Sequence, residues 1–279
     1  MAIRILCIAG PTASGKSSRA VREALTRNGE IISVDSRQIY KSLDIGTEKI
    51  SHEERQGVPH YLIDIIDPCQ TYSAAQFAAD AKQRITEIAG RGKMPILVGG
   101  SHFYYDALLR PLPAHKESSA TDAQYEKLST EALSAKLREL WPQEAKKIDL
   151  RNRRRMLRAL SLLTSHGQIP ERSMSADYAT EWIVLDPERD ELRAAIDTRL
   201  SMAVSRGLIT EVDAVRTLVG DIRLNELGLE YRVIGEHLRG ERSYDSILPA
   251  LSAQLWQYAR RQKAWLRKLR GEGVITAIS

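Results

Sequence analysis

The sequence has little of the chemistry that marks disulfide-rich, zinc-binding or membrane-spanning proteins. Its 279 residues include two cysteines, Cys7 and Cys69, and 6% aromatic residues. Two cysteines are too few for a disulfide framework, and no Cys/His spacing indicates a zinc site. No apolar run is long enough to span a membrane, and the first apolar segment begins too early for a signal peptide to precede it. We therefore expect a cytoplasmic protein without a membrane partner.

The composition that remains is ordinary for a globular protein. Hydrophobic residues make up 43% of the chain and charged residues 28%, with a formal net charge of +5. The length suits one large domain, or a large domain with a smaller one. The mild excess of positive charge favours an anionic partner.

The most informative segment is GPTASGKS, which fits the P-loop pattern G-x-x-x-x-G-K-[ST]. It stands between an apolar run typical of a buried strand, Ile3 to Ala9, and a helical pattern. Glycines let the backbone close around phosphate oxygens, and the N–H groups at the helix start point at the anion. Lys16 would reach the terminal phosphates, and the Ser17 hydroxyl would bind Mg²⁺. The alternative is a glycine-rich turn without a ligand. The motif indicates a polyphosphate of unspecified kind, held by Gly10, Pro11, Thr12, Ala13, Ser14, Gly15, Lys16 and Ser17.

Two further predicted strands end in polar side chains. The run Ile31 to Val34 delivers Asp35, and PILVGG delivers Ser101. Ligands of open parallel sheets bind beyond the carboxyl ends of the strands, so the P-loop, a carboxylate and a hydroxyl should share one edge. Asp35 could instead be a helix cap or a turn residue.

A nucleotide hydrolase usually holds Mg²⁺ with an acid at the end of a hydrophobic strand. PILVGG ends in glycines and Ser101 instead. Two other runs do end in acid, Tyr61 to Asp67 and Trp182 to Asp186, so the sequence leaves an ATPase open.

The chain changes character along its length. Strand and helix patterns alternate over about 110 residues, which predicts an α/β fold with a parallel P-loop sheet flanked by helices. We expect residues 1–113 and 179–279 to form this core and residues 114–178 to form a helical insertion. The elements expected after the first 110 residues are helices over 125–140, 149–165 and 244–270, the last capped by Ser243, and strands over 182–186 and 274–278.

Basic residues gather in two predicted helices. Charge runs are usually solvated helix faces, and aromatics at helical spacing are usually core. Two such clusters beside a P-loop nevertheless favour nucleic acid, because arginine pairs well with phosphate and aromatics stack on unpaired bases. The first cluster is Arg151, Arg153, Arg154, Arg155 and Arg158, and the second is Arg260, Arg261, Lys263, Arg267, Lys268 and Arg270, interleaved with Trp256, Tyr258 and Trp265.

These motifs together resemble the tRNA dimethylallyltransferases, also called isopentenyl-tRNA transferases. The resemblance runs from end to end, and its most diagnostic segments are DSRQIY and YARRQKAW. The matching segments are GPTASGKS, ISVDSRQIYKSLDIGTEK, VPHYLIDIIDP, PILVGGS, RALSLL, LRAAIDTRLSMAVSRGLITEV, LGLEYR and YARRQKAWLR. The chain lacks the C-terminal zinc-finger extension of eukaryotic cytosolic relatives, so we expect the bacterial type.

The resemblance implies a reaction. A dimethylallyl group would pass from dimethylallyl diphosphate to the N6 amine of the adenosine 3′ of the anticodon, tRNA position 37, in tRNAs reading codons that begin with U. The P-loop would then hold a diphosphate leaving group, with Mg²⁺ on Ser17, which explains the missing acid after PILVGG. Asp35 takes the role of general base, Ser101 lies close to the reacting centre, and Lys16 and Arg199 stabilise the diphosphate.

The resemblance also implies contacts with the tRNA anticodon stem-loop, from which the target base must be extruded. We expect the protein to act as a monomer. The residues implied in tRNA binding are Asp35, Ser36, Arg37, Gln38, Arg154, Arg155, Met156, Leu157, Arg158, Arg260, Arg261, Gln262 and Trp265.

The chain departs from the family pattern at His102, Phe103, Arg154, Ser161 and Ala203, which bears on tRNA selectivity more than on the chemistry. Three alternatives stay open: a small-molecule or nucleotide kinase on the same scaffold, a non-catalytic RNA-binding protein with a relic P-loop, and transfer to free AMP. DSRQIY and the basic helices have no explanation in a kinase, and intact Lys16, Ser17 and Asp35 argue against a relic.

Overall fold

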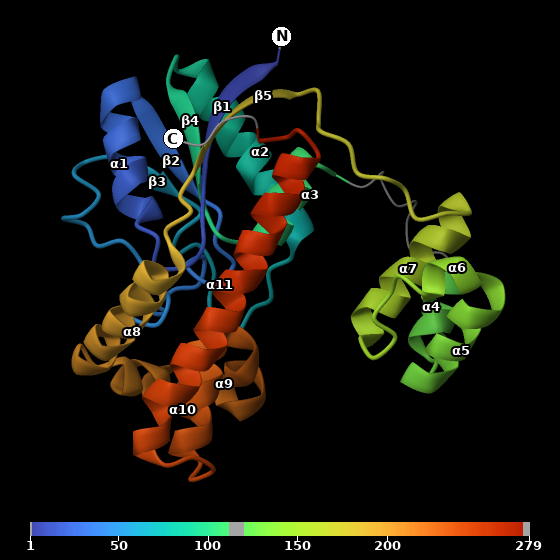
Figure 1. Cartoon of the computed structure of the whole chain (residues 1–279). Coiled ribbons are helices and arrows are strands. Elements are labelled where there is room, and N and C mark those ends of the chain that lie inside the picture. The colour runs from blue at the N-terminus through green and yellow to red at the C-terminus, as the bar shows by residue number, and fades with distance from the viewer. Residues whose placement is uncertain (1, 112–119, 276–279) are drawn as a thin grey trace. The chain divides into compact units, whose positions relative to one another are not determined.

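The computed structural model describes residues 2–111 and 120–275. Within these residues, five parallel strands form one sheet in the order β3-β2-β4-β1-β5 (Figure 1). The predicted α/β fold with a parallel sheet is confirmed. The strands are β1 (Ile3–Ala9), β2 (Gly29–Ser33), β3 (His60–Tyr61), β4 (Met94–Gly99) and β5 (Tyr178–Val184).

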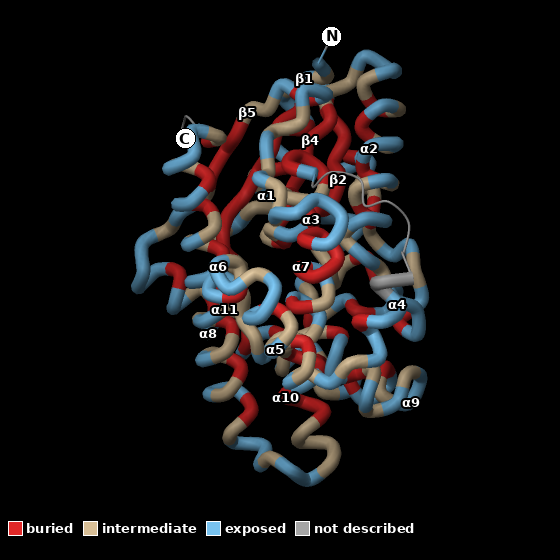
Figure 2. Tube along the Cα trace, turned by 90° about the vertical axis from the view of Figure 1, so that its right-hand side faces the viewer, coloured by how far each residue is buried: buried red, intermediate tan, exposed pale blue. Residues whose placement is uncertain are grey.

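Helices cover both faces of the sheet, which explains why its strands are apolar runs without alternation. Helix α1 (Lys16–Arg27) packs on one face, against Ile8, Ile31 and Ile96. Helices α2 (Ala74–Gly90) and α3 (His102–Leu109) pack on the other face. Figure 2 shows the central strands as a buried layer.

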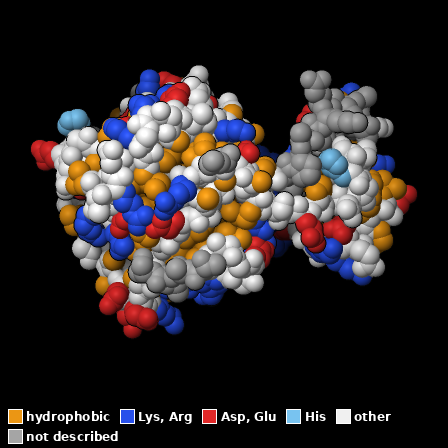
Figure 3. Space-filling model, turned by 90° about the horizontal axis from the view of Figure 1, so that it is seen from above, with side chains coloured by type: hydrophobic (Ala, Val, Ile, Leu, Met, Phe, Trp, Pro, Cys, Tyr) orange, Lys and Arg blue, Asp and Glu red, His pale blue; other side chains and the backbone are white. Residues whose placement is uncertain are grey.

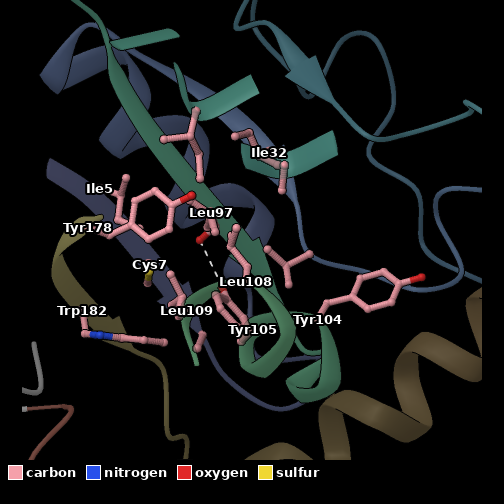
Figure 4. Packing of buried hydrophobic residues seen from close by; sticks show 14 of the residues in the cluster. Ile5, Cys7, Ile32, Leu97, Tyr104, Tyr105, Leu108, Leu109, Tyr178 and Trp182 are labelled. Carbon is pink, nitrogen blue, oxygen red and sulfur yellow. Dashed lines mark hydrogen bonds between the residues drawn. The ribbon is translucent and has the colours of Figure 1, made fainter. Parts of the chain in front are cut away.

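Tyr105 of α3 fixes that helix to the sheet. Its ring is buried beside Cys7, Leu97 and Trp182 (Figure 4). Its hydroxyl lies 3.1 Å from the carbonyl oxygen of Ile8 and 3.2 Å from that of Leu97. A buried tyrosine needs a polar partner for its hydroxyl, and the two strand carbonyls provide it. The start of α3, directly after Ser101, is thereby held at the sheet edge.

A helical layer with its own core follows β5. It consists of α8 (Arg189–Ser205), α9 (Leu208–Leu227), α10 (Leu229–Leu238) and α11 (Ile247–Gly271). The predicted long helix is present, but it begins at Ile247, after a 3-10 turn over Tyr244–Ser246. Ser243 makes no side-chain capping bond there, so the predicted cap is wrong.

The predicted C-terminal strand is not formed where the structure describes it. Val274 and Ile275 lie outside any strand, and residues 276–278 lie outside the described residues. The apolar run Tyr61 to Asp67 is likewise no full strand. Leu62 and Asp64 have φ values of 61° and 56°, which bend the chain out of β geometry.

The described chain divides into two compact units, Met1–Leu109 with Met174–Ser279, and Arg110–Ser173. The smaller unit holds α4 (Ala120–Glu126), α5 (Thr130–Leu140), α6 (Pro142–Ala145) and α7 (Arg153–His166). Ser129 caps α5, so the helix predicted over 125–140 is split in two. Asn152 caps α7, which therefore starts four residues later than predicted. The predicted boundary between residues 113 and 114 lies outside the described residues.

The chain leaves and re-enters the larger unit at one place. The Ser175 N–H donates to the Leu109 carbonyl over 2.7 Å. In the smaller unit, the Arg172 guanidinium donates to the Arg110 carbonyl over 2.9 Å, and Arg110 donates to the Arg172 carbonyl over 3.3 Å. These bonds close the neck of the smaller unit. In the part of the chain that the structure describes, no helix is both long and apolar enough to cross a membrane.

Candidate active site

The P-loop connects β1 to α1 in the conformation that binds anions. Ala13 and Gly15 have φ values of 59° and 78°, and such left-handed residues turn successive backbone N–H groups into one concavity. No side chain caps the start of α1, so its first N–H groups face the loop without a capping bond. Gly10 is required by close approach, because a Cβ there would lie 2.7 Å from the Leu185 carbonyl oxygen.

Lys16 folds back over this loop. Its ammonium donates to the Pro11 carbonyl and lies 3.5 Å from the Ser14 hydroxyl oxygen. Burial lowers the pKa of Lys16 to about 8, while the carboxylates of Asp35 and Glu48 oppose that shift. At pH 7 the side chain is therefore mostly charged, as binding a phosphate requires.

Asp35 and Ser101 meet at the carboxyl edge of the sheet, as predicted from the strand pattern. Asp35 Oδ1 accepts hydrogen bonds from the backbone N–H groups of Arg37 (2.8 Å) and Gln38 (3.3 Å). Ser101 is buried, and its Oγ accepts the Ser36 N–H over 3.0 Å. The strands approach closely here, since a Cβ on Gly99 would lie 2.1 Å from the Val34 carbonyl oxygen. Asp35 is thus a turn residue, and Oδ2 makes no hydrogen bond among the described residues.

Arg199 of α8 reaches the P-loop from the helical layer. Its guanidinium donates to the Thr12 hydroxyl and contacts the carboxylates of Glu48 (3.0 Å) and Glu230 (3.2 Å). Burial raises the pKa of the Glu230 carboxyl, and the Arg199 charge opposes that shift. A guanidinium held by two carboxylates is fixed in position while part of its charge still faces the loop.

The segment after DSRQIY is anchored by Glu211 of α9. The Glu211 carboxylate accepts the backbone N–H groups of Asp44 (2.9 Å), Ile45 (2.6 Å) and Gly46 (3.0 Å). It also accepts the Tyr231 hydroxyl over 2.7 Å. This anchoring places Glu48 beside Arg199.

The polar residues after Asp35 are engaged within the protein. Gln38 donates to the carbonyls of Thr47 (3.1 Å) and Glu48 (3.2 Å), and Arg37 donates to the Glu226 carbonyl over 2.6 Å. The half-buried Ser36 lies with its hydroxyl 3.4 Å from that of Ser101. These bonds shape the edge next to Asp35.

Gln262 of α11 lies in the interior and not at the surface. It is 3% exposed; its Oε1 accepts the Thr12 N–H over 2.8 Å, and its Nε2 donates to the Gly100 carbonyl over 2.9 Å. Trp265 is half-buried, with its ring centroid 5.6 Å from that of Tyr105 and 5.9 Å from that of His102. Arg260 and Arg261 are exposed on the same helix.

The smaller unit presents its predicted residues on two sides of α7. Arg154, Arg155 and Arg158 are exposed, whereas Met156 is fully buried in the core of this unit. Leu157 is half-buried against the same core. These three arginines therefore form an exposed face of α7 with an apolar underside, whereas the half-buried Arg153 donates to the Leu128 and Glu126 carbonyls. On the face of the molecule shown in Figure 3, by contrast, side chains of both charges mix with apolar ones.

Part of the second basic cluster is neutralised by acids. Lys263 forms an ion pair with Asp186 over 2.8 Å, and Arg270 approaches the same carboxylate at 3.8 Å. Lys268 lies 3.7 Å from Glu272. Among the described residues, Arg260, Arg261 and Arg267 are the exposed cationic side chains of α11 without an acidic partner, and the first two directly precede Gln262.

The donors around the P-loop fit a Mg²⁺ ion shared with a phosphate ligand. The described residues contain no cluster of three His, Cys, Asp or Glu side chains that could hold a metal by themselves. Ser17 is exposed in the first turn of α1. Mg²⁺ prefers oxygen ligands and keeps several waters, so one hydroxyl together with phosphate oxygens and water suits it.

The residues that support this site could not be singled out from the sequence. Glu48, Glu211 and Glu230 stand inside longer matching segments and carry no distinct motif of their own. The one available signal was Glu230, an acid between apolar neighbours in LGLEYR. Such an acid is expected to be buried, and a buried carboxylate needs a partner. Its partner, Arg199, is 31 residues away in the sequence and is brought close because α8 and α10 both pack on α11.

Comparisons with known proteins agree with this geometry. A family model described as IPP transferase matches residues 38–269. The tRNA dimethylallyltransferase of Thermomicrobium roseum is 37% identical over 285 residues, covering 95% of this chain and 84% of that protein. The tRNA dimethylallyltransferase of Acetivibrio thermocellus is 38% identical over 282 residues, covering 95% and 89%.

Solved structures lead to the same group. The crystal structure of the full-length tRNA isopentenylpyrophosphate transferase from Bacillus halodurans matches with a TM-score of 0.72 at 34% identity, covering 95% of this chain and 87% of that one. A eukaryotic dimethylallyltransferase acting on tRNA shares the fold with a TM-score of 0.87 at 23% identity, covering 99% and 73%. The chain belongs to the IPP transferase family.

Proposed function

We propose that this chain is a tRNA dimethylallyltransferase. It transfers a dimethylallyl group from dimethylallyl diphosphate to the N6 amine of the adenosine 3′ of the anticodon, position 37, in tRNAs reading codons that begin with U, and it releases diphosphate. The observation that carries the proposal is one sheet edge that holds an anion-binding loop with Lys16 and Arg199 on one side and the Asp35 carboxylate on the other. The names of the relatives supply the substrates.

The P-loop side of the edge suits the leaving group. As the carbon–oxygen bond of dimethylallyl diphosphate breaks, negative charge builds on the diphosphate and positive charge on the allylic carbon. Lys16, the loop N–H groups and Arg199 are fixed before the reaction, so they stabilise that charge without reorganising. Mg²⁺ bound through Ser17 would add charge to the same oxygens and act as a Lewis acid.

The Asp35 side suits the adenine amine. As the new N6–carbon bond forms, the amine loses a proton, and a carboxylate within hydrogen-bond reach accepts it. The backbone donors of Arg37 and Gln38 hold Oδ1, which leaves Oδ2 as the oxygen that orients the amine and takes the proton. The Ser101 hydroxyl, fixed by Ser36, lies next to this position.

The exposed arginines suit the RNA. Arg154, Arg155 and Arg158 on α7, and Arg260 and Arg261 on α11, are exposed and would contact phosphates of the RNA. Ser36, Arg37 and Gln38 shape the sheet edge where the extruded base would bind, and Trp265 packs against His102 and Tyr105 of α3. The buried Met156 and the half-buried Leu157 contribute by supporting the arginine face.

A nucleoside mass profile tests the function. tRNA is incubated with the protein, Mg²⁺ and dimethylallyl diphosphate, without ATP, and then digested. We expect prenylated adenosine from anticodon loops with consecutive adenosines. A strict need for ATP would point to a kinase, and prenylation of AMP in place of tRNA would point to a cytokinin-forming enzyme. No prenylated nucleoside with any tRNA would refute the proposal.

A further inference from the structure

Gln262 joins three segments that are far apart in the sequence. It belongs to α11, and its amide bonds to Thr12 in the P-loop and to Gly100 in the loop that carries Ser101. The first bond spans 250 residues of sequence and the second 162. Both bonds are shielded from water, because the side chain is 3% exposed.

This contact requires an amide side chain at position 262 and a glycine at position 100. Only a side chain with one acceptor and one donor at its end satisfies the Thr12 N–H and the Gly100 carbonyl at once. A Cβ on Gly100 would lie 2.1 Å from the Gln262 nitrogen, so the Gly100 loop leaves room for this amide. Thr12 is then held twice, at its N–H by Gln262 and at its hydroxyl by Arg199.

The amide is not needed to attach the helix. Helix α11 buries an apolar stripe formed by Leu255, Ala259, Leu266 and Leu269, and Gln262 occupies the middle of that stripe. A leucine or methionine would serve helix packing at least as well, because a buried amide costs free energy unless both ends are bonded. The amide of Gln262 therefore holds the two loops that it contacts, the P-loop and the Gly100 loop.

We propose that Gln262 is a positioning residue for the reaction, which sets the P-loop conformation that binds diphosphate. It acts through Thr12 and Gly100 and makes no contact with RNA. Its neighbours Arg260 and Arg261 are exposed, so one turn of α11 faces the RNA on one side and fixes the diphosphate loop on the other. This inference rests on the proposed function and deepens it.

Binding of magnesium pyrophosphate tests the role directly. Calorimetry compares wild type with Gln262→Met, which keeps the length and packing but removes both bonds, and with Gln262→Glu, which keeps only the acceptor. Gln257→Met is the matched control, because Gln257 is exposed on the same helix. Loss of both buried bonds in Gln262→Met should raise the Kd for pyrophosphate roughly tenfold or more. Gln262→Glu loses the bond to the Gly100 carbonyl and should raise that Kd as well. The control and the Kd for an anticodon stem-loop should stay unchanged.

Three results would overturn the inference. One is an unchanged pyrophosphate Kd in both variants while wild type prenylates tRNA, which leaves the proposed function intact. A second is parallel weakening of pyrophosphate and stem-loop binding with a large fall in Tm, which indicates a general structural role. The third is failure of wild type to bind pyrophosphate, which refutes the proposed diphosphate site as well. Amide hydrogen exchange gives an independent readout: the segment containing Thr12 should exchange faster in Gln262→Met and not in Gln257→Met.

Discussion

Replacing Asp35 by asparagine separates the turn-closing role that the structure shows for this side chain from the catalytic role that we propose for it. Asp35 Oδ1 closes the turn after β2 by accepting the Arg37 and Gln38 N–H groups, and the same carboxylate is the proposed base. Asparagine keeps a carbonyl oxygen for the turn but cannot accept a proton at neutral pH. Alanine removes both functions.

The hydrogen bonds of this turn give the expected sizes. A neutral hydrogen bond contributes about 1 kcal/mol and a charge-assisted bond about twice that. Asp35→Asn keeps both bonds in neutral form, so it should lower the free energy of unfolding by about 1–2 kcal/mol. Asp35→Ala removes both charge-assisted bonds at a half-buried turn and should cost about 4 kcal/mol. Loss of a general base lowers turnover by roughly 10²- to 10⁴-fold, and both variants should share this fall.

Single-turnover prenylation of an anticodon stem-loop and urea denaturation measure the two quantities separately. We expect Asp35→Asn to fold nearly as well as wild type, to bind the stem-loop with a similar Kd and to turn over at least about 10²-fold more slowly. If Asp35→Asn keeps near-wild-type turnover, the carboxylate is not the base. If only Asp35→Ala loses turnover, the aspartate acts by holding the turn.

Three other perturbations follow from the same geometry. Because the pKa of Lys16 is about 8, its charge is lost as the pH rises from 7 to 9, and the Kd for pyrophosphate should rise over that range. Lys16→Arg should abolish this rise, and calorimetry at each pH measures the Kd. Replacing Arg154 and Arg155 together by alanine should raise the KM for tRNA, leave that for dimethylallyl diphosphate unchanged, and flatten the log–log salt dependence of tRNA binding by about 0.7–0.9 for each phosphate that is no longer neutralised; unchanged values would indicate plain surface charge. Tyr231→Phe removes the hydroxyl that donates a hydrogen bond to Glu211, and it should lower the free energy of unfolding by about 1–2 kcal/mol. No change in urea denaturation would show that the three backbone donors alone hold that carboxylate.

The sequence was sufficient where the chemistry is local or follows from strand direction. The P-loop is a contiguous motif, and its conformation depends on residues within a few positions of each other. Asp35 and Ser101 could be paired because parallel strands bring their carboxyl ends to one edge. The functional roles of these residues remain predictions, whereas the fold class and the family are confirmed.

The parts that sequence could not supply depend on long-range packing. Glu211 bonds to residues more than 160 positions away, and nothing in its own neighbourhood distinguishes it from a surface glutamate. Gln262 belongs to the matching YARRQ segment, and the resemblance therefore implies an RNA contact for it. In the structure, however, its place in the apolar stripe of α11 turns it inward. Exact helix starts are not predictable here because Ser129 and Asn152 act as caps inside polar stretches that carry many possible caps.

The hydrogen bond between Ser175 and Leu109 makes the smaller unit, Arg110–Ser173, a self-contained helical insertion. The chain leaves and re-enters the larger unit at two hydrogen-bonded residues. Strands β4 and β5 on either side therefore do not depend on the insertion to stay in place. Lengthening, shortening or exchanging that insertion changes the length of a closed loop, and the entropic cost of closing a loop grows only slowly with its length. The helical insertion can therefore vary in length and sequence while the sheet edge that holds Lys16 and Asp35 keeps its structure.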